Sequence, residues 1–378
     1  MKTRNICLVL ALCILIGLMA ACSTSTSSTD SPGETPATKA AASQAFTVTD
    51  VLGRKVSFEK APESLVALGA NTLRLVCYLD AADKVIGIET FEEKPTIYRP
   101  YGIAYPDLAK LPVVAESMGA ADVEQIMALG TDVIFCSYPE AEDADNLQSS
   151  TGIPVVCVKY SKGVFGDDFY SALRIVAETL GESDKAETVI DYVEKCKNDL
   201  VKRTENIPDE GKLSVYMGGE NFNGWHGIDG TNSEFVPLDI IGGKNVAADS
   251  GTAGTLGAFL VDLEQIVAWN PDYIVLNVEN LGLVEDQYKS NPNLFKSLKA
   301  VQNGTVYKSL PYLWYGTNTE LALIDAYYLG TLLYPEQFAD IDIAKKSDEI
   351  FNAMLSTPLY DACQEATGGC FGKYTIGG

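Results

Sequence analysis

Three segments of this chain carry most of the side chains that could do chemistry. Each combines tyrosine or tryptophan with glycine, proline or asparagine: they are YRPYGIAYPD from Tyr98, NFNGWHGIDGTN from Asn221 and PYLWYGTN from Pro311. Aromatic side chains in loops lose the packing that usually stabilises them, and a flat or apolar ligand would restore that contact. These residue types therefore favour stacking and hydrogen bonding to a bound molecule.

The residue patterns of common enzymes are missing. His226 is the single histidine, and the sequence has no HExxH, GxSxG, P-loop or paired CxxC pattern. Carboxylates are abundant, so composition alone leaves a glycosidase open. A lone histidine is more often a hydrogen-bonded loop residue than a metal ligand, although His226 beside Trp225 could offer an imidazole to iron. We expect a binding protein, not an enzyme, with no metal bound directly by the chain unless His226 supplies a ligand.

Two segments that start 140 residues apart repeat one pattern of a helix followed by a strand. DVEQIMALGTDVIF starts at Asp122 and DLEQIVAWNPDYIV at Asp262, and they agree at seven of fourteen positions. In each copy the apolar residues form one helical stripe, so Glu124 and Glu264 point away from it. Aspartate followed three residues later by glutamine is a capping pattern. Capping explains the aspartates and glutamines better than it explains both exposed glutamates.

The repeat extends further and indicates two similar α/β lobes. Residues 69–85 align without a gap with residues 230–246, and a strand–helix–strand unit over residues 64–89 requires a parallel strand pair. Residues 166–207 have helical spacing, and a helix of ~20 residues there would span ~30 Å. We therefore predict an α/β fold with two lobes, each with a short parallel sheet, joined by a single long interlobe helix. The lobes are expected at residues 46–165 and 208–378, with residues 166–207 between them.

The first 45 residues are expected to lie outside this fold. Residues 1–21 have the order of a secretory signal, with basic residues, an apolar run and small residues. The two alanines before Cys22 resemble a bacterial lipobox, in which the cysteine is lipidated. Residues 22–45 are rich in Ser, Thr, Pro and Ala and predict a flexible linker. An uncleaved membrane anchor is the alternative for the apolar run.

Charge and cysteine usage narrow the partners. The formal net charge is −23, which argues against nucleic acid and favours a basic partner surface or a cationic ligand. Of the arginines outside the first 45 residues, only Arg74 and Arg99 fall near the aromatic loops, which indicates a neutral or weakly charged ligand. Cys363 and Cys370 are expected close together in a glycine-containing C-terminal loop, where a local disulfide is expected and a metal pair is the rival interpretation.

Together these features resemble the substrate-binding lipoproteins of ABC importers for iron chelates, haem and cobalamin. The resemblance rests on the signal ending at Cys22, TDVLGRKVSF, the Gly-Asn-Thr helix start, the paired DVEQI and DLEQI segments, the interlobe helix and NGTVYKSLP. It covers essentially the whole chain after the linker. It implies two α/β lobes joined by one long helix, with the ligand held in the cleft between them.

The resemblance also implies where the functional residues lie. In open α/β sheets, ligands bind beyond the carboxyl ends of the strands. The candidates for ligand binding are Asn71, Thr72, Tyr98, Arg99, Tyr101, Tyr138, Trp225, His226, Asn232, Tyr312, Trp314 and Tyr315. Members of the family carry one glutamate on each lobe that pairs with arginines of the permease. On this chain those are Glu124 and Glu264.

The function implied is that of a bacterial receptor on the extracytoplasmic face of the cell membrane, anchored there by lipid. It would capture an iron chelate, such as a siderophore or haem, and deliver it to an ABC permease dimer with its ATPase. We expect a monomer with no cofactor and no nucleic-acid partner. A corrinoid receptor of the same class is the first alternative. A surface sensor or adhesin that works without a permease is the second.

Overall fold

A computed structural model describes residues 45–117, 120–138, 140–160, 164–250 and 257–378. The predicted signal, Cys22 and all of the predicted linker except residue 45 lie outside these ranges. Within the described residues, no helix combines the length and apolar character needed to cross a bilayer.

The first sheet has five parallel strands in the order β5-β4-β3-β6-β7. The strands are β3 (Leu65–Leu68), β4 (Val85–Glu89), β5 (Val113–Ala115), β6 (Val133–Cys136) and β7 (Val155–Cys157). The strands β3, β6 and β7 are buried at every position, as expected for short runs of Val, Ile and Leu in a parallel sheet covered on both faces. The connecting helices include α1 (Thr72–Tyr78), α2 (Pro100–Ala104), α3 (Val123–Leu129) and α4 (Ala141–Thr151).

The second sheet has the order β10-β8-β12-β13-β14, parallel except for β14. Its strands are β8 (Ser214–Gly218), β10 (Lys244–Asn245), β12 (Tyr273–Asn277), β13 (Val306–Ser309) and β14 (Gly372–Lys373). Its helices include α7 (Val236–Asp239), α8 (Leu263–Trp269), α9 (Leu281–Ser290), α10 (Pro292–Ser297) and α11 (Lys299–Asn303). The two sheets confirm the predicted α/β fold with short parallel sheets.

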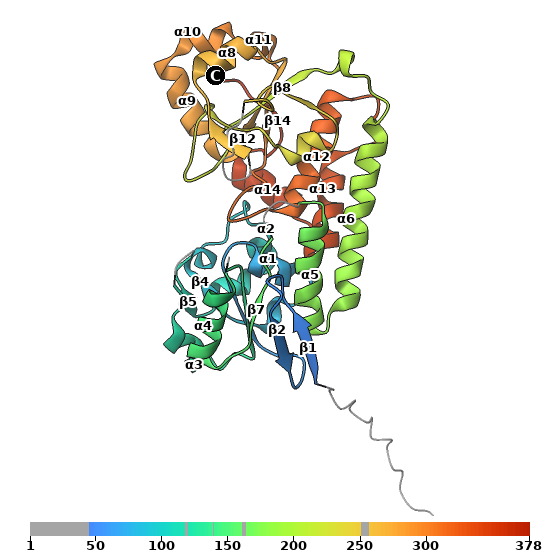
Figure 1. The fold of residues 1–378 in the computed structure, drawn as a ribbon. Helices are drawn as coiled ribbons and strands as arrows, with labels where there is room; N and C mark the ends of the chain where they lie inside the picture. Colours follow the sequence, from blue (N-terminus) through green and yellow to red (C-terminus); the bar gives the residue numbers. More distant parts are fainter. Residues whose placement is uncertain (1–44, 118–119, 139, 161–163, 251–256) are drawn as a thin grey trace, which may run out of the picture. The chain divides into compact units, whose positions relative to one another are not determined.

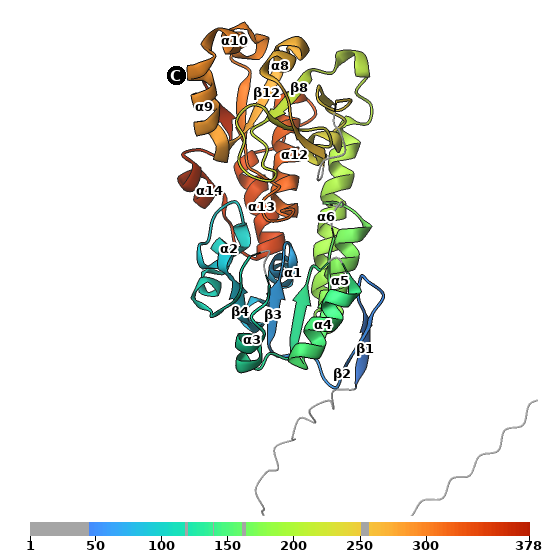
Figure 2. The same cartoon turned by 60° about the vertical axis from the view of Figure 1, so that its left-hand side comes forward.

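Two antiparallel strand pairs lie outside these sheets. The hairpin of β1 (Phe46–Thr49) and β2 (Lys55–Phe58) lies beside helix α5 (Figure 2). The pair of β9 (Gly230–Asn232) and β11 (Ala258–Leu260) belongs to the second half of the chain.

Two long helices, α5 and α6, connect the first sheet to the second along the chain, and α6 runs beside both halves in the structure (Figure 1). Helix α5 (Asp167–Leu180) ends at Gly181, whose φ of 77° forms a left-handed C-cap. The 22-residue α6 (Ser183–Thr204) follows and contacts α5, α12 (Thr319–Leu333) and α13 (Ile343–Leu355) (Figure 1). Because α13 also contacts α1, the last helices brace both halves of the chain alongside α6. The short α14 (Tyr360–Thr367) completes the set.

The internal repeat has a structural counterpart at the strand starts. Asp132 accepts hydrogen bonds from the amide and hydroxyl of Ser64, at 3.0 and 3.1 Å. Asp272 accepts hydrogen bonds from the amide and hydroxyl of Ser214, at 2.8 and 2.7 Å. The aspartate that follows each repeated helix therefore ties two parallel strands together in the same way.

The two repeated helices differ in their caps. Asp122 accepts a hydrogen bond from the Gln125 amide at 3.0 Å, as the capping pattern predicts. Asp262 occupies the same place before α8 but makes no side-chain cap, so that prediction was wrong for the second copy. The wider alignment also breaks down locally, because Asn71 precedes helix α1 whereas Asn232 ends strand β9.

Candidate functional site

A cavity of about 470 Å³ lies where loops from both halves of the chain meet. Half of the residues that line it are aromatic, and none of the described residues that line it is charged. They are Phe91, Asn221, Phe222, Asn223, Gly224, Trp225, Leu313, Trp314, Tyr315 and Gly316. We call this cavity, with those residues, the cleft.

Each segment of the cleft follows the carboxyl end of a parallel strand. Phe91 lies two residues after β4, residues 221–225 follow β8, and residues 313–316 follow β13. This is the edge at which open α/β sheets place their ligand loops. The fold therefore brings three loops, distant in sequence, around one space.

The loop after β13 is held in a tight turn against the first half of the chain. Tyr315 has a φ of 48°, which is uncommon for a bulky residue, and Gly316 has a φ of 95°. A Cβ atom on Gly316 would lie 2.0 Å from Oδ1 of Asn71, so only glycine fits there. Asn71 Oδ1 also accepts the Thr317 amide at 2.8 Å, and the Tyr315 hydroxyl donates to Glu89 at 2.5 Å. The turn is thus fixed on both sides.

One carboxylate organises the polar edges of the cleft. Glu279 follows β12 and accepts the indole N–H of Trp225 at 3.2 Å and of Trp314 at 3.0 Å. The Asn221 amide donates to its other oxygen at 2.6 Å. Burial, with the negative charge of Glu279 nearby, raises the pKa of Tyr98 to about 12.

The predicted arginines are buried and bonded within the protein. Arg99 is 2% exposed, is paired with Glu92 at 2.6 Å, and lies under the Trp314 ring at 5.0 Å. Arg74 is 1% exposed and donates to Asn71 and to the Trp314 carbonyl. Both support the cleft from behind and do not present a guanidinium to it.

Eleven of the twelve predicted ligand contacts separate into three groups, and His226 lies apart from them. Trp225, Trp314 and Tyr315 line the cleft together, and Trp225 is 64% exposed. Tyr98 and Tyr138 are half-buried and outside the lining. The other side chains are enclosed within the protein, apart from His226: they are Asn71, Thr72, Arg99, Tyr101, Asn232 and Tyr312. All six are buried in this structure, and their contact with a ligand stays a prediction.

His226 faces a different hollow. Its Nε2 is 2.8 Å from the Phe222 carbonyl, and its ring lies 4.3 Å from the Phe222 ring. Among the described residues, no group of three or more His, Cys, Asp or Glu side chains is arranged to hold a metal ion. A hydrogen-bonded loop residue therefore describes His226 in this structure.

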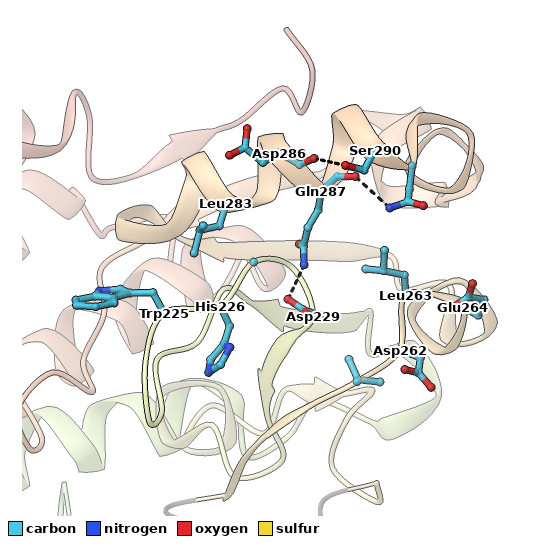
Figure 3. Close-up of a pocket in the computed structure, with 13 residues that line it drawn as sticks. Trp225, His226, Asp229, Asp262, Leu263, Glu264, Leu283, Asp286, Gln287 and Ser290 are labelled. Carbon is cyan, nitrogen blue, oxygen red and sulfur yellow. Dashed lines mark hydrogen bonds between the residues drawn. The ribbon is translucent and has the colours of Figure 1, made fainter.

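The second hollow, of about 670 Å³, lies beside α8 and α9 (Figure 3). Glu264, Asp262 and Asp286 line it, and the loop with Trp225 and His226 forms another part of its wall. Gln287 and Asp229 also line this hollow, and the side-chain amide of Gln287 donates a hydrogen bond to Asp229 at 2.7 Å. Trp225 therefore borders both this hollow and the cleft.

The two glutamates predicted to meet a permease are both exposed. Glu124 lies in the first turn of α3 and Glu264 in the first turn of α8, and in each helix only the central isoleucine is fully buried. Their surroundings differ, because the hollow lies next to Glu264. Exposure at matching positions keeps both available to a partner.

Several residues of the cleft were not named as ligand contacts from the sequence, although four of them lie in the aromatic segments that the sequence singled out. They are Phe91, Asn221, Phe222, Asn223 and Leu313, and Glu279, which bonds Trp225 at the edge of the cleft, was not named either. A signal was present, since each follows within a few residues of an apolar strand. The strand-end rule, applied to every strand, would have included Phe91 and Glu279.

The C-terminal cysteines are enclosed. Cys363 lies within α14, not in the expected loop, and Cys370 follows that helix. Both are buried and neither is bonded in a disulfide here. Their pairing stays a prediction.

Comparison with known proteins gives the family. Residues 65–312 match the family model of periplasmic binding proteins. The chain belongs to the periplasmic binding protein family. It is 22% identical over 335 residues to the molybdate-binding protein MolA of Haemophilus influenzae, covering 82% of this chain and 91% of that one. It is 26% identical over 212 residues to the iron(3+)-hydroxamate-binding protein FhuD of Bacillus subtilis, covering 54% and 63%.

A solved structure supports the fold of this periplasmic binding protein. A periplasmic solute-binding protein from Veillonella parvula superposes with a TM-score of 0.69 at 22% identity, covering 86% of this chain and 97% of that one. The protein is thus an extracytoplasmic substrate-binding protein of an ABC transporter and is not an enzyme.

Proposed function

We propose that this periplasmic binding protein captures an iron chelate in the cleft and delivers it to an ABC permease. The observation that carries the proposal is the aromatic, uncharged lining of a cavity of about 470 Å³. A chelate presents a large apolar or aromatic surface around its metal, and aromatic walls restore packing to such a surface. The similarity to an iron(3+)-hydroxamate-binding protein is consistent with this class.

A small oxyanion such as molybdate fits this cleft less well. Tetrahedral oxyanions are recognised by hydrogen-bond donors and positive charge. Here both indole N–H groups donate to Glu279, and Arg74 and Arg99 are bonded within the protein. We therefore place the chelate ahead of molybdate, although MolA is similar over more of the chain.

A tryptophan-fluorescence titration tests the ligand class. Purified protein is titrated with ferric siderophores, haem, cobalamin and molybdate. Trp225 and Trp314 line the cleft, so an iron chelate should quench them saturably. Saturation by cobalamin alone would replace the iron-chelate proposal with a corrinoid receptor, and a response to molybdate alone would contradict it.

We further propose that Glu124 and Glu264 dock on the two halves of the permease and that Cys22 anchors the chain by lipid. Both glutamates are exposed at the start of equivalent helices. Two equal contacts suit two equal permease subunits, and a monomeric receptor suffices to make both.

Reversing both charges, with Glu124→Arg and Glu264→Arg, should lower uptake at least ~10-fold, because like charges at an interface cost several kcal/mol. Chelate affinity should stay within about twofold, since neither residue lines the cleft. Uptake of radiolabelled chelate and fluorescence titration measure the two quantities. Glu59→Arg with Glu336→Arg is the matched control, because both residues are exposed and the charge change is equal. Unchanged uptake in the double variant would contradict docking through these two glutamates.

A further inference from the structure

We infer that the cleft selects ligands that carry positive charge on an apolar body, and that Glu279 sets this preference. The inference rests on the proposed function, because it concerns the ligand of the same cleft. The inference adds to that function the sign of the ligand's charge and the residue, Glu279, that favours this sign.

The first step is the orientation of the cleft's polar groups. Trp225 and Trp314 line the cleft, and each directs its indole N–H to the same oxygen of Glu279. The Tyr315 hydroxyl donates to Glu89. The aromatic rings therefore use their donor edges on carboxyl groups and leave their carbon surfaces to line the cavity. Such surfaces, with their negative faces, attract cations.

The second step is the withdrawal of positive charge. The Arg99 guanidinium donates hydrogen bonds to the Glu92 carboxylate and to the carbonyls of Phe91 and Lys94, at 2.6, 2.5 and 2.9 Å. Its group also lies beneath Trp314, on the protein side of that ring. An anionic ligand would therefore meet aromatic surface where it needs a cation. Freeing Arg99 would leave Glu92 buried without its partner, which is costly.

The third step is the negative charge that remains near the cleft. Glu279 is half-buried, and its only described side-chain partners are neutral donors from Asn221, Trp225 and Trp314. No described arginine or lysine lies within ion-pair distance of it. Tyr98, in the other half of the chain, lies near this charge, and its pKa is raised to about 12 by burial first and by the charge of Glu279 second. A ligand cation entering between these loops would neutralise this carboxylate.

Collisional quenching tests the sign of the field without any ligand. Caesium, iodide and acrylamide quench exposed indoles and differ in charge, and the Trp225→Phe variant isolates the signal of Trp225. Glu279→Gln keeps an acceptor for the indoles and removes the charge. It should lower the ratio of caesium to iodide quenching of Trp225 by roughly 1.5- to 2-fold at low salt, with acrylamide quenching unchanged. Glu336→Gln, at an exposed site, controls for net charge.

A matched ligand series tests selection. Ferrioxamine B has an uncharged ferric trihydroxamate core and one ammonium group. Acetylation of that amine gives a neutral chelate, and succinylation gives an anionic one. The protein should bind the cationic form about five- to tenfold more tightly than the neutral form, with the anionic form weakest. In Glu279→Gln the cationic and neutral forms should bind equally, and 0.5 M salt should narrow the wild-type preference.

The outcomes separate the inference from the proposed function. Equal binding of the three forms, tightest binding of the anionic form, or an unchanged quenching ratio in Glu279→Gln would overturn the inference and leave the iron-chelate proposal standing. Failure of all three forms to bind would count against a ferric trihydroxamate as the ligand. In that case the ratio of caesium to iodide quenching of Trp225 alone shows whether the cleft favours positive or negative charge.

Discussion

Replacing Glu220 by glutamine is expected to stabilise the protein by several kcal/mol at pH 8.5 and by less than about 1 kcal/mol at pH 5. Glu220 is 4% exposed at the start of the loop that carries Trp225, and burial raises its pKa from 4.5 to about 8. A raised folded-state pKa means that stability is greatest below about 4.5 and is lost as pH rises to about 8. The difference between the two pKa values corresponds to roughly 5 kcal/mol of stability. The wild-type protein loses this stability as pH rises, whereas the glutamine variant does not ionise and keeps it.

Urea unfolding at pH 5, 7 and 8.5 measures this difference. Asp325, fully buried in α12, lies in the field of Glu220, and its pKa is also raised, by burial first and then by that charge. Asp325→Asn should therefore show the same direction, and Glu336→Gln, on the surface, should show no pH-dependent difference. Parallel curves for wild type and Glu220→Gln would show that Glu220 is charged in the folded state.

Replacing Arg99 by methionine should destabilise the fold by about 3–5 kcal/mol, because it leaves Glu92 buried without its charge partner. The pair joins atoms 2.6 Å apart, and the two side chains are 2% and 5% exposed. Burial already raises the pKa of Glu92, against the opposing effect of Arg99. Methionine preserves much of the volume beneath Trp314, so charge is the main change.

Adding Glu92→Gln to Arg99→Met should recover at least half of that loss. Glutamine is neutral and can still accept the Tyr101 hydroxyl, which now donates to Glu92 at 2.7 Å. Thermal unfolding of the two single variants and the double variant gives the coupling between the residues. Additive losses would show that the ion pair contributes little and that packing against Trp314 dominates.

The sequence was sufficient to predict the class of fold, and the reason is periodicity. Runs such as VIFC and YIVLN, each after a short amphipathic helix, indicate parallel strands. The order β5-β4-β3-β6-β7 was not predictable in the same way, because strand pairing depends on contacts between residues far apart in the chain.

The site was predictable only in part, because residue type does not show what a polar group binds. Asn71 has the type of a ligand contact, yet its oxygen is used by the Thr317 amide, 246 residues later. Arg99 likewise has a typical anion-binding side chain that Glu92 occupies. Trp225, Trp314 and Tyr315 line one cavity, since large aromatic side chains in glycine-containing loops have few other places to pack, and their contact with a ligand stays a prediction.

Trp225 forms a wall shared by two hollows, the cleft and the space beside Glu264. A ligand that displaces this indole changes both volumes at once and breaks its bond to Glu279. Filling the cleft would therefore alter the surface next to the proposed docking glutamate without any movement of one lobe against the other. The position of the Trp225 side chain can thus make the surface beside Glu264 differ between the ligand-bound and the ligand-free receptor.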